Sequence, residues 1–310
     1  MSSGRRDRTV RVFVYASQDD RALIEAAVRD AGGVLSSAES AEAVIWASND
    51  VEALIPFLFD GVRWVQLYAA GVDAWIRGGV IDRSRLWTAG KGVYGAVIAE
   101  YCLALLLACA ARLPEAARAR AWNPLTADSI SGKTVGVIGA GGIGSELIRL
   151  LEPFGARTLA ITRTGRTVQG ATESYGLGGL DRVLRDSDYV ALCAASTPQS
   201  RGLLSRERIA LMKPNSFVVN IARGALIDTD ALVEAIDEGR VRGAALDVTD
   251  PEPLPDDHPL WHLPTVIVTP HMSGSAPAWR ESFAARLREN VARYIADSPL
   301  LGVVDLDLGY

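Results

Sequence analysis

The chain has 310 residues, of which 49% are hydrophobic, and a formal net charge of -5. This length exceeds that of one ordinary hydrophobic core and predicts two domains. The acidic balance leaves no broad positive field, which excludes a nucleic acid or an anionic membrane surface as the main partner and favours small-molecule chemistry.

The N-terminal part is predicted to form a small α/β domain. Strand-like runs occur at 10–15, 43–47, 64–69 and 86–89, and a helical stretch at 19–31 ends at Gly32-Gly33. The first 15 residues enter the first strand without the apolar segment and cleavage site of an export signal. Because the three cysteines are scattered and form no CxxC pair, we expect a cytoplasmic protein without a metal site.

A long, nearly apolar helix is predicted over residues 96–112. Apolar side chains occupy its whole circumference, so we expect it to be covered on all sides. Its longest apolar run, 99–111, is too short to cross a bilayer and indicates a buried helix rather than a membrane anchor. Cys102 and Cys109 are expected on one buried face of this helix.

A second domain begins with a run of strands that alternate with helical segments. Six continuous apolar runs, typical of strands buried on both faces, span 134–138, 158–162, 189–193, 217–221, 244–248 and 266–269. The last helical stretch, 278–296, can return to the first domain. We therefore predict an α/β protein with two doubly wound parallel sheets.

The first of these six strands leads into a glycine-rich turn and a helix. The turn reads Gly-Ala-Gly-Gly-Ile-Gly over 139–144, the GxGxxG order that dinucleotide binding requires. Gly139 permits the tight turn, Gly141 lets the backbone approach a pyrophosphate, and Gly144 allows close packing of helix on strand. Free amides near Gly142 and Ile143 then favour the phosphate charge. A plain glycine-rich turn shares this motif, and so does the turn that binds a different cofactor such as S-adenosylmethionine.

The end of the second strand bears on cofactor choice. NAD-specific sites place Asp or Glu there to bind the ribose 2'-hydroxyl, whereas this chain has Thr162 followed by Arg163, Thr164 and Arg166. Guanidinium groups pair well with a phosphate, so NADP(H) is favoured, with NAD(H) as the alternative. If both arginines are ordinary surface residues, the site accepts either cofactor.

Three polar residues follow the last three long strands, where open α/β sheets form their active sites. They are Arg223, Glu252 and His271. Reduction of a 2-oxo acid needs a cation for the carboxylate, a proton donor for the developing alkoxide and a group that holds the donor protonated. Each residue also has a structural reading: a salt-bridge arginine, a surface glutamate and a core histidine.

As a set, these motifs give the chain a resemblance to the D-isomer-specific 2-hydroxyacid dehydrogenases, which include glyoxylate/hydroxypyruvate reductases and phosphoglycerate dehydrogenases. The resemblance is carried by AAGVD at 69–73, the GxGxxG, TPQSRGL at 197–203, MKP at 212–214, NIARG at 220–224, LDV to Pro253 from 246, and TPH at 269–271. The motifs occur in the family's order and at its approximate spacing.

The resemblance implies hydride transfer between a nicotinamide cofactor and a small 2-oxo acid or D-2-hydroxy acid. It implies a discontinuous, flavodoxin-like substrate domain of residues 1–92 and 276–310, a Rossmann-type cofactor domain of 93–275, and a homodimer formed through the long apolar helix and residues 112–131. The residues expected at the cofactor are Gly139, Gly141, Gly142, Ile143, Gly144, Thr162, Arg163, Thr164, Arg166, Thr197, Ala222 and Asp247.

By motif, Arg223 resembles the ligand of the substrate carboxylate and carbonyl, His271 the acid/base, and Glu252 its partner. The backbone amides of Ala70, Gly71 and Val72 resemble a second carboxylate cradle, and Asp247 resembles the residue that faces the nicotinamide carboxamide. Candidate pocket residues, none of which indicates one particular substrate, are Ser48, Asn49, Tyr68, Tyr94 and Trp279.

Three other classes share parts of this pattern. A non-enzymatic dinucleotide sensor of the same fold can lose the three polar residues, which are all present here. A lysine-using β-hydroxyacid dehydrogenase usually opens with its GxGxxG, whereas this motif begins at Gly139. Formate dehydrogenase lacks a Glu-His pair, so Glu252 favours the hydroxyacid reaction.

Overall fold

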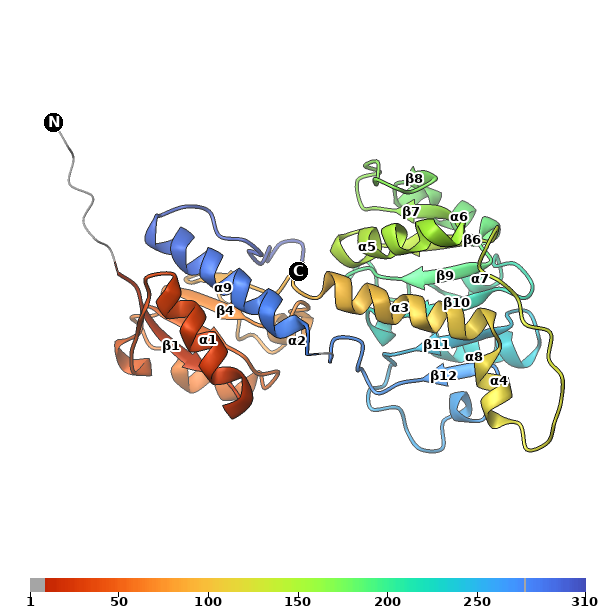
Figure 1. Ribbon diagram of the computed structural model, residues 1–310, viewed down its shortest axis with the longest axis horizontal. Coiled ribbons are helices and arrows are strands. Elements are labelled where there is room, and N and C mark those ends of the chain that lie inside the picture. The colour runs from red at the N-terminus through yellow and green to blue at the C-terminus, as the bar shows by residue number, and fades with distance from the viewer. Residues whose placement is uncertain (1–8, 276) are drawn as a thin grey trace. The chain divides into compact units, whose positions relative to one another are not determined.

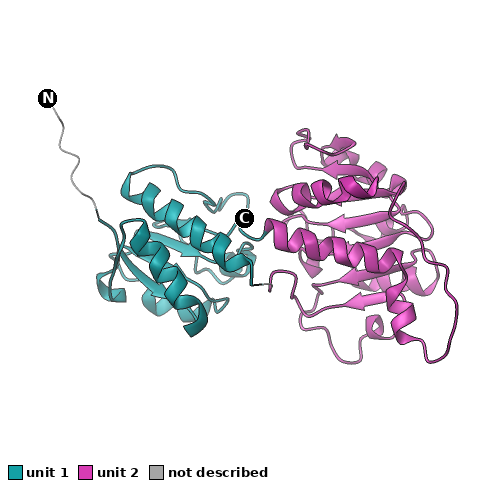
Figure 2. Ribbon diagram, in the orientation of Figure 1, with its two compact units in different colours: residues 1–94, 277–310 teal, residues 95–276 magenta. Residues whose placement is uncertain are grey.

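The computed structural model describes residues 9–275 and 277–310. The chain divides into two compact units, one of residues 1–94 with 277–310 and one of 95–276 (Figure 2). The N-terminal residues 1–8, where we expect no export signal, and the expected domain boundary at residue 276 lie outside the described residues.

The first unit is built on a five-stranded parallel sheet with the order β2-β1-β3-β4-β5, the flavodoxin-like arrangement expected from the sequence. Its strands are β1 (Arg11–Tyr15), β2 (Val34–Leu35), β3 (Ala43–Trp46), β4 (Trp64–Leu67) and β5 (Leu86–Thr88). Its helices are α1 (Gln18–Asp30), α2 (Asp73–Arg77) and α9 (Trp279–Ile295), with short 3-10 turns at Ala38–Ser40 and Glu52–Phe57.

Helix α9 completes this unit from residues 279–295. It packs against α1 (Figure 1). Its buried Asn290 donates to Gln66 Oε1 of β4 at 2.9 Å and accepts from the Leu301 amide at 2.8 Å. The polar side chain thus links the helix, the sheet and the C-terminal segment. An apolar residue in its place would remove the hydrogen bond that the Gln66 side-chain oxygen accepts.

The second unit has a seven-stranded parallel sheet with the order β12-β11-β10-β9-β6-β7-β8. Its strands are β6 (Thr134–Ile138), β7 (Arg157–Ile161), β8 (Glu173–Tyr175), β9 (Tyr189–Leu192), β10 (Phe217–Asn220), β11 (Gly243–Leu246) and β12 (Val266–Val268). Its helices are α3 (Gly95–Ala110), α4 (Leu113–Arg118), α5 (Gly142–Leu151), α6 (Leu180–Asp186), α7 (Arg206–Ile209) and α8 (Thr229–Asp237), with 3-10 turns at Glu152–Phe154, Leu177–Gly179, Gly224–Leu226 and Pro259–Trp261.

Hydrophobic clusters cover both faces of this sheet, which confirms the doubly wound prediction. The strand order reverses beside β6, between β9 and β7, and open α/β sheets bind ligands at such a switch point. The first β-strand of the unit, β6, is fully buried because its neighbours on both sides are strands and helices cover it above and below.

Helix α3 is covered less completely than its sequence predicts. Cys102 and Cys109 are buried on one face, as expected, and that face packs against α5. On the opposite side Ala96 and Ala104 are exposed, and several larger apolar residues are only partly buried. Within this chain the helix therefore leaves open to solvent an apolar strip that is interrupted by Glu100, which is exposed between these two alanines.

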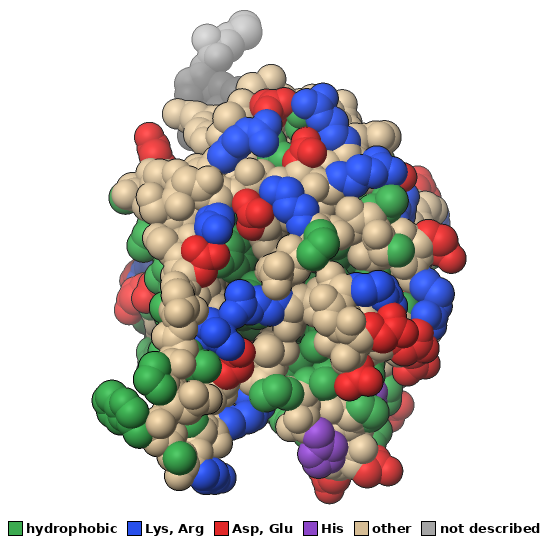
Figure 3. All heavy atoms as spheres, turned by 90° about the vertical axis from the view of Figure 1, so that its right-hand side faces the viewer, with side chains coloured by type: hydrophobic (Ala, Val, Ile, Leu, Met, Phe, Trp, Pro, Cys, Tyr) green, Lys and Arg blue, Asp and Glu red, His purple; other side chains and the backbone are tan. Residues whose placement is uncertain are grey.

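The surface of the molecule shows no large region of one charge on the face drawn in Figure 3, where basic and acidic side chains are interspersed. Among the described residues, no helix is long and apolar enough to cross a membrane.

Candidate active site

The glycine turn after β6 is shaped by two glycines that have no room for a side chain. Gly139 has a φ of +96°, and a Cβ there would lie 2.5 Å from the backbone of Ala194, which follows β9. A Cβ on Gly144 would lie 2.6 Å from the Gly139 carbonyl oxygen. These contacts draw the loops after β6 and β9 together and seat α5 against β6.

The third glycine of the motif leaves open space. A Cβ on Gly141 would meet nothing within 4 Å, and Gly141 and Gly142 are exposed at the start of α5. Ile143 is half-buried behind them. The first amides of α5 therefore face an uncovered region, and a helix N-terminus of this kind accommodates phosphate groups. The residues present fit the pyrophosphate of a dinucleotide.

Beyond β7, the residues expected at the ribose begin with a threonine whose hydroxyl is buried. Thr162 is 6% exposed, and its Oγ1 has no hydrogen-bond partner among the described residues. Arg163 and Thr164 are exposed, whereas Arg166 donates from Nη2 to the Ala140 carbonyl oxygen at 2.8 Å. Arg166 is therefore held against the glycine turn itself, and Arg163 extends from the surface beside it.

Thr197 lies in the loop after β9 and is half-buried. Its amide donates to Ser200 Oγ at 2.8 Å, and the Ser200 amide donates to Thr197 Oγ1 at 3.2 Å. This reciprocal pair gives the loop a fixed turn next to the glycine motif.

The arginine that follows β10 is held by its backbone. Asn220, fully buried at the end of β10, accepts from the Ala222 amide at 3.0 Å and donates to the Arg223 carbonyl at 2.9 Å. The Arg223 guanidinium donates to the Ala222 carbonyl at 2.8 Å. A Cβ on Gly224 would lie 1.9 Å from the Thr249 backbone, so only glycine lets this loop lie against the one after β11. Sequence reasoning quoted Asn220 within a motif but assigned it no role.

Asp247, at the end of β11, holds the loop that carries His271. It is 1% exposed, and its Oδ1 accepts from Thr269 Oγ1 at 2.6 Å and from the Met272 amide at 2.9 Å. Its Oδ2 accepts from the Ser273 amide at 2.9 Å. The backbone carbonyl of Asp247 also accepts from the His271 amide at 2.8 Å. The sequence offered no signal for this clamp.

His271 is fixed in an uncommon backbone conformation, with a φ of +51°. Non-glycine residues seldom adopt this region and persist in it when the surrounding contacts enforce it, as the Asp247 clamp does here. The imidazole Nδ1 lies 2.7 Å from Glu252 Oε1, and both side chains are more than 40% exposed, at 45% and 41%. Among the described residues, the ring nitrogen Nε2 has no hydrogen-bond partner and can bond a ligand.

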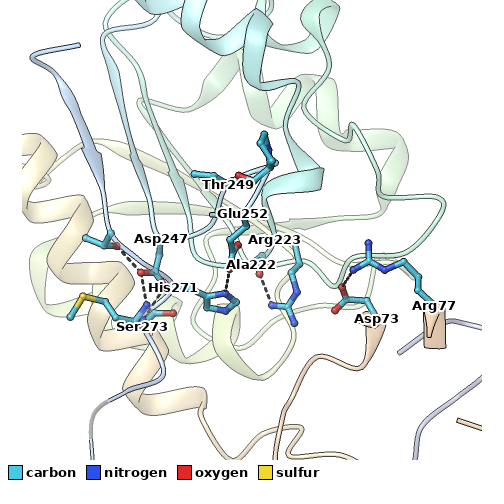
Figure 4. A network of polar contacts seen from close by, with 12 residues as sticks. Asp73, Arg77, Ala222, Arg223, Asp247, Thr249, Glu252, His271 and Ser273 are labelled. Carbon is cyan, nitrogen blue, oxygen red and sulfur yellow. Dashed lines mark hydrogen bonds and ion pairs between the residues drawn. The ribbon is translucent and has the colours of Figure 1, made fainter. Parts of the chain in front are cut away.

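Arg223, Glu252 and His271 come from the loops after three adjacent strands, β10, β11 and β12, and gather at the carboxyl edge of the sheet (Figure 4). A carboxylate on Nδ1 fixes the tautomer and the orientation of the imidazole, while a guanidinium nearby offers paired donors to an anionic oxygen. The arrangement can transfer a proton at Nε2 next to a bound anion.

In the first unit, the expected carboxylate cradle follows β4 and leads into α2. None of the backbone amides of Ala70, Gly71 and Val72 has an acceptor among the described residues. The ion pair of Asp73 with Arg77 lies on α2 just beyond (Figure 4).

Four of the candidate pocket residues form a cluster in the first unit. The Trp279 ring centroid lies 5.6 Å from that of Tyr68 and 6.0 Å from that of Tyr94. Tyr94 donates its hydroxyl to the Tyr68 carbonyl at 2.9 Å, and burial raises the pKa of both phenols, with Asn49 bonding the Tyr68 side chain. Ser48 instead accepts from the Asp50 amide. The two phenols are therefore neutral donors at neutral pH.

The fold and this site define a dinucleotide-binding oxidoreductase of the doubly wound α/β class. The chain belongs to the D-isomer specific 2-hydroxyacid dehydrogenases: residues 103–273 match the model of that family's NAD binding domain. It is an oxidoreductase that transfers a hydride between a nicotinamide cofactor and a small 2-oxo acid or 2-hydroxy acid.

Individual relatives agree with this assignment. The chain is 32% identical to the glyoxylate reductase of Thermococcus gammatolerans over 82% of each protein. It is 35% identical to the D-3-phosphoglycerate dehydrogenase of Mycobacterium leprae over 68% of this chain and 41% of that enzyme. Among solved structures, a D-isomer specific 2-hydroxyacid dehydrogenase from Xanthobacter autotrophicus, in complex with NADPH and MES, is similar with a TM-score of 0.85 and 26% identity, covering 98% of this chain and 100% of that one.

Proposed function

We propose that this enzyme prefers NADPH and reduces small 2-oxo acids to D-2-hydroxy acids. The observation that carries the cofactor preference is the end of β7, where the buried Thr162 replaces a carboxylate and Arg166 is anchored to the glycine turn through Ala140. No negative charge at that position opposes a 2'-phosphate, and Arg163 and Arg166 supply cations. The related Xanthobacter enzyme was solved with NADPH.

When bound, the nicotinamide supplies or accepts the hydride. Arg223 holds the substrate carboxylate and its carbonyl oxygen. His271 donates a proton from Nε2 to the developing alkoxide, and Glu252 holds Nδ1 so that Nε2 is the nitrogen that carries the transferable proton. In the reverse direction His271 Nε2 accepts that proton.

The test of cofactor choice compares kcat/KM for NADPH and NADH with glyoxylate and hydroxypyruvate as substrates. We expect wild type to favour NADPH by at least tenfold, because one charge-assisted contact contributes about 1.5–3 kcal/mol. Arg163→Ala and Thr162→Asp should both shift the ratio toward NADH. Arg201→Ala, which removes an exposed arginine paired with Asp250, is the matched control and should not.

Preference for NADH in wild type, or an unchanged ratio in both variants, would contradict the cofactor proposal. Absence of turnover with every 2-oxo acid, together with tight NADPH binding, would instead favour the non-enzymatic sensor of the same fold.

We also propose a homodimer in the cytoplasm. The apolar strip on α3 and the nearby exposed Leu113 and Trp122, which are 55% and 98% exposed, suit burial against a second copy. The cysteines Cys102, Cys109 and Cys193 are free, which fits a reducing compartment. Light scattering should give twice the chain mass of 33.1 kDa, and Trp122→Asp should lower it. A monomeric wild type would overturn the dimer.

A further inference from the structure

Two cysteine side chains meet beside the glycine turn of the second unit. Cys102 lies on α3, and Cys193 is the residue that directly follows β9. Both belong to the hydrophobic cluster on the α3 face of the sheet, and their two thiols form a hydrogen bond with each other. Neither residue has a role in the proposed hydride transfer, so the pair needs an explanation of its own.

The two sulfurs differ in their access to solvent. Cys102 is 0% exposed, whereas Cys193 is partly exposed. The hydrogen bond with Cys193, together with burial, raises the pKa of the Cys102 thiol well above its usual value. A hydrogen bond that favours the protonated form of Cys102 is one that this thiol donates and Cys193 Sγ accepts. An oxidant dissolved in water therefore reaches Cys193 first, and finds a second thiol already in contact with it.

The backbone of Cys193 is in direct contact with the glycine turn. Its amide donates to the carbonyl oxygen of Ile138, the residue before Gly139, at 2.8 Å. A Cβ on Gly139 would lie 2.8 Å from the Cys193 carbonyl carbon and 2.5 Å from the backbone of Ala194. Because no space separates the two loops, a displacement of residues 193–194 must also move the turn.

We propose that hydrogen peroxide links Cys102 and Cys193 by a reversible disulfide, and that this bond lowers the affinity of the enzyme for its dinucleotide. The two sulfurs must approach from hydrogen-bond contact to a covalent distance of about 2.05 Å, which draws the end of β9 toward α3 and away from its present contacts with the turn. The effect on the dinucleotide rests on the proposed function, whereas formation of the bond does not.

The oxidation takes place in two steps. The Cys193 thiolate attacks one oxygen of the peroxide, the O–O bond breaks, and the products are a sulfenic acid and a hydroxide, which takes up the proton that Cys193 released and leaves as water. The Cys102 sulfur then attacks the Cys193 sulfur, the S–O bond breaks, and a second water leaves with the Cys102 proton. Two thiols have given up two electrons and two protons, and one peroxide has become two waters. Dithiothreitol reverses the change by thiol–disulfide exchange.

The first experiment locates the bond. The full-length enzyme is treated with hydrogen peroxide and alkylated, and the single-chain band of a non-reducing gel is digested with trypsin. No Lys or Arg separates Cys102 from Cys109, so peptide 92–112 carries both of them, while peptide 186–201 carries Cys193. We expect these two peptides to be linked in wild type, and the link to disappear with dithiothreitol.

Three variants assign the linked residues, and circular dichroism checks that each is folded. Cys109→Ala is the matched control, because Cys109 is as buried as Cys102 on the same helix, and it should form the link like wild type. Cys102→Ala and Cys193→Ser should not form it. Absence of the link from wild type, or its persistence in Cys102→Ala, would overturn the proposal.

The second experiment measures the Kd for NADPH from the quenching of tryptophan fluorescence, before and after peroxide. We expect oxidation to raise the Kd at least tenfold in wild type and in Cys109→Ala, and dithiothreitol to restore it. The Kd of Cys193→Ser should not respond to peroxide. A linked enzyme with an unchanged Kd would overturn the effect on the dinucleotide. A reduced enzyme that binds neither NADPH nor NADH would instead contradict the proposed function, and the peptide map would still decide whether the disulfide forms.

Discussion

Replacing Asp247 by asparagine should destabilise the second unit and displace the His271 loop. The carboxylate accepts three hydrogen bonds from residues 269–273, two on Oδ1 and one on Oδ2, and it is 1% exposed. If the amide oxygen of asparagine keeps the bonds from Thr269 and Met272, its NH2 group faces the Ser273 amide. Two donors then oppose each other in a buried position.

The magnitude follows from this count. The variant loses one hydrogen bond to a charged acceptor, worth about 1.5–3 kcal/mol, and leaves a buried donor unsatisfied. We therefore expect the free energy of unfolding to fall by about 2–4 kcal/mol. For a unit of this size each kcal/mol lowers Tm by about 2–4 °C, which predicts a decrease of roughly 5–15 °C. Because the same loop sets the position of His271, kcat/KM should fall at least tenfold as well.

Thermal unfolding followed by circular dichroism measures the first effect, and steady-state reduction of glyoxylate the second. Asp250→Asn is the matched control for stability: its side chain is 43% exposed, it is paired with Arg201 at 3.2 Å, and its loss should lower Tm by about 2 °C or less. If Asp247→Asn melts like Asp250→Asn, the clamp does not hold the loop and the reasoning fails.

Five further substitutions at four positions test the rest of the site. Arg223→Ala should lower kcat/KM by about 100-fold or more. Arg223→Lys should recover little of this activity, because lysine cannot make the bidentate contact of a guanidinium. Near wild-type turnover of a folded Arg223→Ala variant would mean that the active site lies elsewhere. Glu252→Gln keeps a hydrogen-bond partner for His271 but removes the negative charge of the carboxylate. We expect kcat for reduction to fall about tenfold or more, while the KM for cofactor stays constant. An unchanged kcat would show that the pair is not coupled in catalysis. Gly144→Ala should lower Tm markedly, because its Cβ would lie 2.6 Å from the Gly139 carbonyl oxygen. Gly141→Ala places its Cβ in open space, so this variant should keep its Tm but have a higher KM for cofactor. Equal Tm losses in both variants would contradict this division of roles.

The strands that could be located from the sequence are those marked by a continuous run of apolar residues. Continuous apolar runs marked β6, β9 and β10 to within one or two residues, because strands covered on both faces need apolar side chains throughout. Strands β2 and β8 were missed, since β2 has two residues and β8, a half-buried edge strand, reads ESY. An edge position supplies no apolar run to recognise.

The candidate site divides in the same way. The glycine motif and the polar residues after the strands are visible in sequence because their chemistry and spacing are local. The clamp made by Asp247 is not, because its meaning depends on which loops the sheet places side by side. Asp247 is 22 residues from Thr269 along the chain, and only the pairing of β11 with β12 makes them neighbours.

The return of α9 to the first unit also affects how the chain is made. The second unit is one continuous stretch and has all of its strands and helices once residue 276 has been synthesised. The first unit lacks α9 and the C-terminal segment until the ribosome has added the last 34 residues, so Gln66 has no Asn290 to bond and the surface that α1 presents to α9 stays open. At bacterial or eukaryotic elongation rates the N-terminal segment waits roughly 10–40 s while about 180 residues are translated. During that interval the strands of the first unit lack the cover of α9, so this unit completes its fold after the second one, although its strands come earlier in the chain.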